Sequence, residues 1–317
     1  MKEDKKVVLH PSSAQSLMDR SLQAIEQEDF QTALRNLDQL LAHGVENFQI
    51  NIGKIICLIQ LGEQTDAILF CEEVMEDERN EHFFDYLFYY VTLLFEANEY
   101  AKLIAYIDNI EKNMDIDPAH RTSYEEIYHM CVEMNARQAL ELWENFLEEL
   151  REKNAPKAWI AFHDWAACQV TMPNDFKELL ANNDIHPVIQ TEILLHLKRS
   201  KMNQTVKIHK FDEVGTIDTN MLHAVEGDPL SQEVLGKIQS LEDENPSQHE
   251  AMTSMLHHFM YVHYPFAFPK EDVQNFVDAL YGIQEHQLLF QPSEEKVTNP
   301  YVAKLVQAMN LYIELVL

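Results

Sequence analysis

The sequence predicts an all-α fold built from stacked helical hairpins. Three observations predict it: residues that break helices are scarce, small residues recur at a nearly constant interval, and apolar residues keep helical spacing after each of them. Only 7 Gly and 11 Pro occur among 317 residues, of which 46% are hydrophobic. So few breakers favour long helices with short connections over a sheet architecture with many turns.

A phrase of polar residues followed by a small and an aliphatic residue recurs four times. Its phase residues are Ala33, Ala67, Leu103 and Ala139, at intervals of 34, 36 and 36 residues. Polar residues suit the turn between two antiparallel helices, and a small side chain lets the second helix approach the first. Apolar side chains follow four and seven positions later on the same helix face. They are Leu37, Cys71, Ile107 and Trp143, then Leu40, Val74, Ile110 and Phe146.

The segment before each phrase also has helical spacing and is expected to form the first helix of a hairpin. These segments cover about residues 16–27, 47–61, 85–97 and 122–133. The sequence therefore predicts four degenerate hairpins over residues 12–152, preceded by a disordered N-terminus at residues 1–11.

These phased hairpins resemble the tetratricopeptide-repeat (TPR) family, whose period is about 34 residues. The resemblance covers roughly residues 12–152. The family's first-helix Trp, Leu-Gly and Tyr and its closing Pro are mostly missing, and Leu103 stands where Ala is expected. The resemblance implies a TPR-like α-α solenoid, wound as a right-handed superhelix, in which the first helix of each hairpin lines a concave face.

The whole chain is also similar to a group of uncharacterised proteins of Firmicutes-type bacteria, in which such repeats precede a further C-terminal region. Three phrases carry this resemblance: residues 186–195, residues 206–211 and Tyr264-Pro265-Phe266. Since that group has no assigned activity, the resemblance implies an architecture and no mechanism.

Beyond residue 152 the repeat phase is lost, but helical patterns continue. We expect residues 153–200 to continue the stack irregularly. Residues 201–317 are expected to form a C-terminal region with a small β-hairpin near 205–218 and four helices, at about 229–241, 246–262, 271–285 and 300–317. The last helix either seals the end of the stack or forms a homodimer contact, and sealing is the favoured alternative.

The charge balance restricts the partners. With 24 Lys+Arg against 53 Asp+Glu, the net charge of −29 disfavours both nucleic acids and anionic membranes. The apolar run near the N-terminus is too short for a signal peptide, and no apolar run in the sequence is long enough to span a membrane. Four widely spaced cysteines without a C-x-x-C pair are typical of reduced, buried residues. A cytoplasmic protein is expected.

Candidates for chemistry are few. The closest histidine group, His257, His258 and His263, has spacings that take His263 off the shared helix face, so no metal site is predicted. His163 and Asp164 are adjacent, and adjacent helical residues point about 100° apart. No nucleotide-binding or nucleophile motif occurs, so neither a cofactor nor catalysis is predicted. A hydrolase with an unrecognised His/Asp site in the C-terminal half stays the least favoured alternative.

One basic cluster stands out in this acidic chain. Cations near a helix C-terminus are stabilised by the macrodipole, and this structural interpretation is preferred to a docking site for acidic surfaces. The cluster consists of His196, Lys198, Arg199, Lys201, Lys207, His209 and Lys210.

The resemblance also suggests a binding groove. It implies that the fifth and ninth positions of each first helix face the concave wall, and these are Met18, Leu22, Ile52, Ile56, Phe88, Thr92, Tyr124 and Tyr128. An apolar, tyrosine-bearing groove suits a hydrophobic or helical segment of a partner, although the same residues could instead pack between repeats. The leading hypothesis is a scaffold or adaptor that binds a protein or peptide. A peptide-sensing receptor is the second hypothesis.

Overall fold

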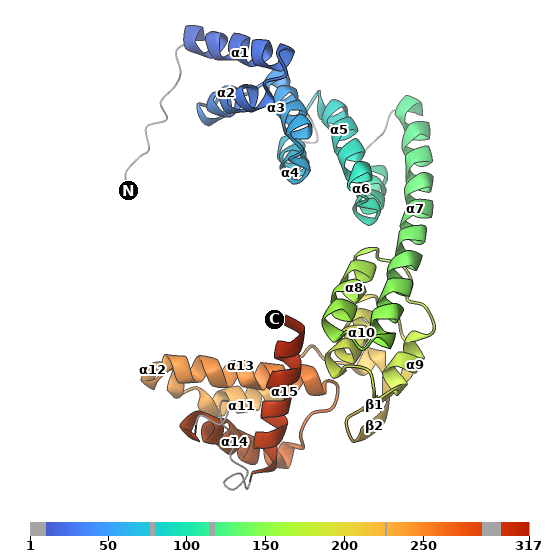
Figure 1. The fold of residues 1–317 in the computed structure, drawn as a ribbon, viewed down its shortest axis with the longest axis vertical. Helices are drawn as coiled ribbons and strands as arrows, with labels where there is room; N and C mark the ends of the chain where they lie inside the picture. The colour runs from blue at the N-terminus through green and yellow to red at the C-terminus, as the bar shows by residue number, and fades with distance from the viewer. Residues whose placement is uncertain (1–10, 77–79, 114–117, 226, 287–298, 317) are drawn as a thin grey trace. The chain divides into compact units, whose positions relative to one another are not determined.

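The computed structural model describes residues 11–76, 80–113, 118–225, 227–286 and 299–316 (Figure 1). The expected disordered N-terminus falls almost entirely outside these ranges. The chain divides into two compact units, Met1–Ala136 and Arg137–Leu317. The described residues form helices and one two-stranded antiparallel hairpin, which confirms the predicted fold class.

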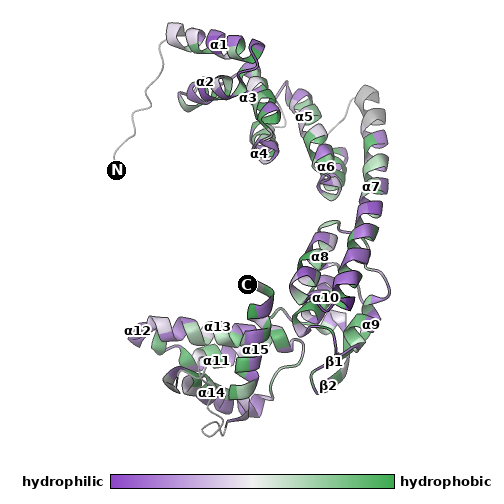
Figure 2. Cartoon of the chain, viewed as in Figure 1, coloured by the Kyte–Doolittle hydropathy of each residue, from purple (hydrophilic) through white to green (hydrophobic). Residues whose placement is uncertain are grey.

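The first unit is a succession of helical hairpins. Its helices are α1 (Pro11–Glu26), α2 (Phe30–Ala42), α3 (Phe48–Leu61), α4 (Gln64–Val74), α5 (Phe83–Glu96) and α6 (Tyr100–Asn113), followed by the start of α7 (Pro118–Arg151). Each helix from α1 to α6 contacts the next along the chain. Figure 2 shows hydrophilic and hydrophobic residues alternating along these helices, as expected of amphipathic elements.

One turn geometry closes every hairpin. Glu28, Gly62, Asn98 and Lys153 all have a left-handed backbone, with φ between +58° and +76°. In each turn the next amide donates to the carbonyl five residues before it, at N···O distances of 2.9 to 3.0 Å. These bonds use carbonyls that the end of a helix would otherwise leave unpaired. Five residues after each left-handed residue comes a side chain with 0% exposure, and these are Ala33, Ala67, Leu103 and Ala158.

The expected fourth turn near Ala136 is wrong, because α7 runs through it without a break for 34 residues. The first three turns contain a residue that accepts the left-handed conformation, or a capping side chain such as Asp29. Around Ala136, by contrast, the sequence consists largely of good helix formers, and Asn135 is buried. The fourth turn instead lies at Lys153, where Asn154 caps the next helix through the amide of Lys157.

The second unit begins within α7 and contains most of the remaining elements. Its helices are α8 (Ala155–Ala167), α9 (Phe176–Ala181), α10 (Pro187–Arg199), α11 (Pro229–Ile238), α12 (Leu241–Glu244), α13 (Pro246–His263), α14 (Val273–His286) and α15 (Pro300–Val316). Two short 3-10 helices are η1 (Thr219–Met221) and η2 (Lys270–Asp272). Strand β1 (Thr205–Lys210) pairs with β2 (Glu213–Asp218), with Thr205 opposite Asp218 and Lys210 opposite Glu213.

Two hydrophobic clusters fill the second unit. One joins α7, α8, α9, α10 and the inner face of β1, where Val206 and Ile208 are buried. The other joins α11, α13, α14 and α15, with Phe259, Phe276 and Leu305 among its buried residues. Helix α15 packs against α13 and α14 within this cluster.

All four cysteines are buried, and none of them forms a disulfide with another described residue. Burial raises the pKa of the Cys57 thiol to about 11 and that of Cys71 to about 12, and it also raises the pKa values of Cys131 and Cys168. A thiol is reactive as its thiolate, so these cysteines act as small apolar packing residues.

Candidate functional site

The eight residues predicted to line a groove lie on the first helices of the hairpins, and none of them is buried. Leu22 on α1 is 48% exposed and Phe88 on α5 is 67% exposed. Thr92 is also exposed, whereas the other five residues are half-buried: Met18, Ile52, Ile56, Tyr124 and Tyr128. Ile52, Tyr124 and Tyr128 contact the hydrophobic cluster around α5, so part of their surface does pack between repeats.

Neighbouring first helices contact each other directly. The amide nitrogen of Asn51 on α3 donates to the Tyr86 hydroxyl on α5 at 3.2 Å, and Phe48 stacks on His82 with ring centroids 3.9 Å apart. Helix α1 contacts α3, where Gly53 permits a close approach to Ile25 of α1 and also to Leu37 of α2. Helices α1, α3 and α5 therefore form a continuous row.

Each helix of this row has a stripe with polar ends and a mainly apolar centre. On α5 the exposed stripe runs Asp85, Phe88, Thr92 and Glu96, at intervals of three or four residues that keep them on one face. The corresponding stripes are Gln15, Met18, Leu22 and Glu26 on α1, and Gln49, Ile52, Ile56 and Gln60 on α3. We call this face the row face. It is a mainly apolar strip between two polar edges.

Tyr124 and Tyr128 on α7 present protonated hydroxyls near this row. Burial raises the pKa of Tyr124, and burial together with the Asp108 carboxylate raises that of Tyr128. Both phenols are therefore hydrogen-bond donors at neutral pH.

A buried polar cluster in the second unit was missed by the sequence reasoning. It is centred on Gln190, Thr191 and Glu192 of α10. The two N–H groups of the Gln190 side-chain amide are shared among four backbone carbonyls, those of Leu179, Leu180, Asn182 and His209, which lie 3.0 to 3.3 Å from Nε2. This side chain therefore ties α9 and β1 to α10. The three polar residues within the otherwise apolar stretch 187–195 were the available signal.

Lys210 contributes a buried amine to this cluster. Its side chain is 1% exposed, and its Nζ donates to the Thr191 hydroxyl at 2.7 Å and to the Tyr264 carbonyl at 2.6 Å. Burial lowers the pKa of Lys210 well below its ordinary value. These bonds join the three phrases at 186–195, 206–211 and 264–266. The basic cluster predicted from sequence is thus no single patch, because Lys210 and His196 are buried while Lys201 and Lys207 are exposed.

Glu192 lies beside His163, which was not expected to pair with its sequence neighbour Asp164. The distance from His163 Nε2 to Glu192 Oε1 is 3.6 Å, and that from Arg199 Nη2 to Glu192 Oε2 is 3.5 Å. The Tyr261 hydroxyl donates to the same carboxylate. Burial works to raise the pKa of Glu192, but its His163, Tyr261 and Arg199 neighbours outweigh burial and lower it. The carboxylate is therefore ionised and paired at neutral pH.

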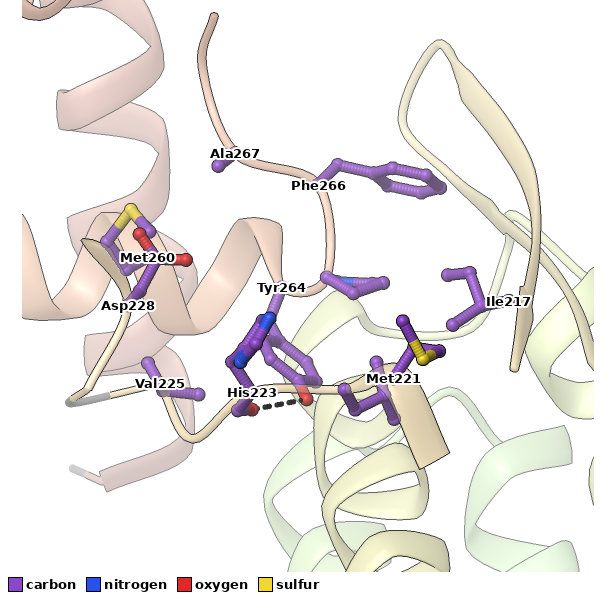
Figure 3. A pocket seen from close by; sticks show the side chains of 11 residues that line it. Ile217, Met221, His223, Val225, Asp228, Met260, Tyr264, Phe266 and Ala267 are labelled. Atoms are coloured by element: carbon purple, nitrogen blue, oxygen red, sulfur yellow. Dashed lines mark hydrogen bonds between the residues drawn. The ribbon is translucent and has the colours of Figure 1, made fainter. Parts of the chain in front are cut away.

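A small apolar cavity lies where the connector after α13 meets the end of the hairpin (Figure 3). Its volume is about 220 Å³. Figure 3 shows Phe266, Ile217 and Met221 around it, with the Tyr264 hydroxyl donating to the His223 carbonyl at 2.8 Å. Phe266 packs over Gly215, where an added Cβ would lie 2.9 Å from the ring. The nearby Asp228 carboxylate caps α11, so the cavity suits an apolar group.

The remaining candidates are placed as follows. His263 is buried and stacks on Phe211 and Phe259, whereas His258 stacks on Tyr312. Within the described ranges no three His, Cys, Asp or Glu side chains are grouped as metal ligands. Across those same ranges, every helix is too short or too polar to cross a bilayer.

A comparison with known proteins bears on the repeats. The chain is 22% identical over 273 residues to the TPR repeat-containing protein YsoA of Bacillus subtilis (strain 168), which is 84% of this chain and 81% of that protein. The chain is a distant homologue of a tetratricopeptide-repeat protein. An alignment of that length extends beyond the first unit, so the similarity to YsoA includes part of the second. No protein-family profile matches the sequence, and no solved structure matches it.

Proposed function

We propose that the protein is a non-catalytic interaction scaffold of the cytoplasm, and that the row face of α1, α3 and α5 binds a segment of a partner protein. The observation that carries the proposal is the stripe, polar at its ends and mainly apolar at its centre, that recurs on α1, α3 and α5. Phe88, at 67% exposure, is a large aromatic side chain, and aromatic residues are enriched at the cores of interfaces. TPR proteins in general bind other proteins, and this supports the same assignment.

The polar edges indicate the chemistry of the partner. Glu26, Asp85 and Glu96 flank the apolar strip, and the chain has a net charge of −29. A helical or extended segment with apolar anchors and Lys or Arg on its margins complements both features, because edge charges steer association and select partners. A free peptide with the same pattern would bind in the same way, as the sensor hypothesis requires.

The experiment is a site-specific crosslink with a matched control. A photo-crosslinking phenylalanine analogue placed at position 88 or 22 is expected to capture a co-purifying partner. The same analogue at position 69 is the control, because Leu69 is 56% exposed on the second helix of a hairpin. Capture that is equal at 69 and 88 would contradict the proposal.

An affinity measurement completes the test. Phe88→Glu is expected to weaken binding of the captured partner about tenfold or more, corresponding to at least about 1.4 kcal/mol. Leu69→Glu should leave the affinity unchanged. If the captured species is a short peptide and curvature changes by small-angle scattering when it binds, the sensor hypothesis replaces the scaffold.

A further inference from the structure

A second cavity in the second unit lies beside the Glu192 cluster. Its volume is about 910 Å³, at the upper end of the range of pockets that enclose small organic ligands. Its walls come from α10, α13, α15 and residues 224–225. This cavity shares no residue with the row face, so it calls for a separate explanation.

One face of α13 forms the long wall. The lining residues of this helix recur at intervals of three and four residues, from Glu250 to Tyr261, and so share one face. Eleven residues of helix span about 16 Å. At the Tyr261 end the wall is aromatic, because Tyr312 of α15 meets Tyr261 edge to face at 5.9 Å and stacks on His258 at 4.1 Å.

The last turn of α10 adds two cations, Lys198 and Arg199. The buried Glu192 carboxylate forms an ion pair with the Arg199 guanidinium, and the Tyr261 hydroxyl donates a hydrogen bond to the same carboxylate. A guanidinium has five N–H donors, and the Arg199 side chain is 61% exposed, so donors remain for a ligand. A cation that is positioned by a buried carboxylate is already oriented for an anionic group.

Two polar atoms of lining residues lack partners. Thr253 Oγ1 and His258 Nδ1 are buried and make no hydrogen bond within the described part of the chain. Buried polar atoms are normally satisfied. Because both atoms have almost no accessible surface, they lie within the wall of the cavity and do not face its interior.

We propose that this cavity binds a small aromatic anion. Its carboxylate or phosphate lies against Lys198 and Arg199, and its ring packs against Tyr261 and Tyr312. Glu250, about 16 Å from Tyr261 along α13, disfavours a second anionic group at the far end.

The test is titration calorimetry on the full chain with four probes. Phenyl phosphate and phenylacetate supply a ring with either anion, phenol supplies the ring alone, and inorganic phosphate supplies the anion alone. At least one aromatic anion is expected to bind at a single site at least tenfold more tightly than phenol and inorganic phosphate. The tighter of the two identifies the anion as phosphate or carboxylate. Binding of phenol as tight as that of the aromatic anions, or no binding of either aromatic anion at 5 mM, which is roughly the weakest useful affinity for a ligand of this size, would overturn the proposal.

Variants locate the site. Arg199→Gln is expected to weaken aromatic-anion binding at least tenfold, because it removes a charge-assisted contact. Since that change also leaves Glu192 without its cation, Lys198→Gln is the second variant, and circular dichroism checks the fold of both. Tyr312→Leu should reduce the preference for phenyl phosphate over inorganic phosphate. Lys207→Gln, on the exposed side of β1, is the matched control and should bind as the parent does. Unchanged affinity in the folded Lys198 and Tyr312 variants would contradict this location.

Discussion

The Nζ atom of Lys210 lies 2.7 Å from the hydroxyl of Thr191, in an interior where no carboxylate of the described residues pairs with it. The Thr191 hydroxyl in turn donates to the Tyr261 carbonyl at 2.7 Å. The strand that carries Lys210, the helix that carries Thr191 and the end of α13 are therefore linked through one amine. The amine has two acceptors in this interior, Thr191 Oγ1 and the Tyr264 carbonyl.

The first prediction concerns alkaline pH. Because the pKa of Lys210 is lowered in the folded chain, the unfolded chain binds more protons than the folded chain between that lowered pKa and pH 10.5, so stability should rise with pH in this window. The slope should approach about 1.4 kcal/mol per pH unit while Lys210 is neutral only in the folded state. Lys210→Met should remove this slope, as measured by urea unfolding at several pH values. Lys207→Met, an exposed neighbour on β1, is the control, and an identical slope in both variants would exclude the explanation.

The second prediction concerns acid. Burial is the main reason that the pKa of His186 is lowered to about 4 and that of His263 to about 3. Below pH 6.5 the unfolded chain takes up these protons while the folded chain does not, so the second unit should lose stability as pH falls from 6.5 to about 4. Each histidine contributes up to about 1.4 kcal/mol per pH unit. His263→Phe should flatten the loss in acid unfolding curves, whereas the exposed His257→Gln should not. A steeper loss in His263→Phe would count against the assignment.

The third prediction tests where the fourth turn lies. Lys153 has φ of +58°, a conformation that glycine adopts without strain, so Lys153→Gly should raise stability by about 0.5–1 kcal/mol. Ala136→Gly lies at an exposed site inside α7 and should lower stability by about 1 kcal/mol. Thermal unfolding of both variants measures whether each substitution raises or lowers the stability. If Ala136→Gly raised the stability, that result would support a turn near Ala136, as the repeat interval predicts.

The fourth prediction tests the close approach within the first unit. A Cβ on Gly53 would lie 3.3 Å from Leu37 Cδ1 and 3.8 Å from Ile25 Cδ1. Gly53→Val should therefore destabilise the first unit by about 1–3 kcal/mol through overpacking. Gly236→Ala, in a helix with open space around its Cβ position, should instead stabilise by up to about 1 kcal/mol. Chemical denaturation measures both, and a neutral Gly53→Val would show that α3 does not pack closely here.

The sequence predicts the elements where local signals agree. The left-handed turns at Glu28, Gly62 and Asn98 coincide with the repeat phase, so the first three hairpins follow from spacing alone. The prediction of the fourth turn was wrong because Ala139 fits the repeat interval although the residues around it favour a helix. The true turn precedes Ala158 and is marked by the capping residue Asn154, which does not fit that interval. The interval between the third and fourth turns is 55 residues, which no constant period would find.

The polar cluster was harder to predict because it depends on contacts between distant segments. Glu192 and Tyr261 are 69 residues apart, and Lys210 and Tyr264 are 54 apart. The alternation in β1 did contain a signal, because Val206, Ile208 and Lys210 share the inward face of the strand. Recognition of a buried lysine from that alternation requires the assumption that one face of the hairpin is covered.

The four shielded cysteines have a practical consequence. Under native conditions none of Cys57, Cys71, Cys131 and Cys168 offers a reactive sulfur at the surface. A maleimide dye would then attach selectively to a single cysteine introduced at an exposed site, without removal of the natural ones. Fluorescent dyes or spin labels for distance measurements can therefore be attached to either unit without replacing the natural cysteines.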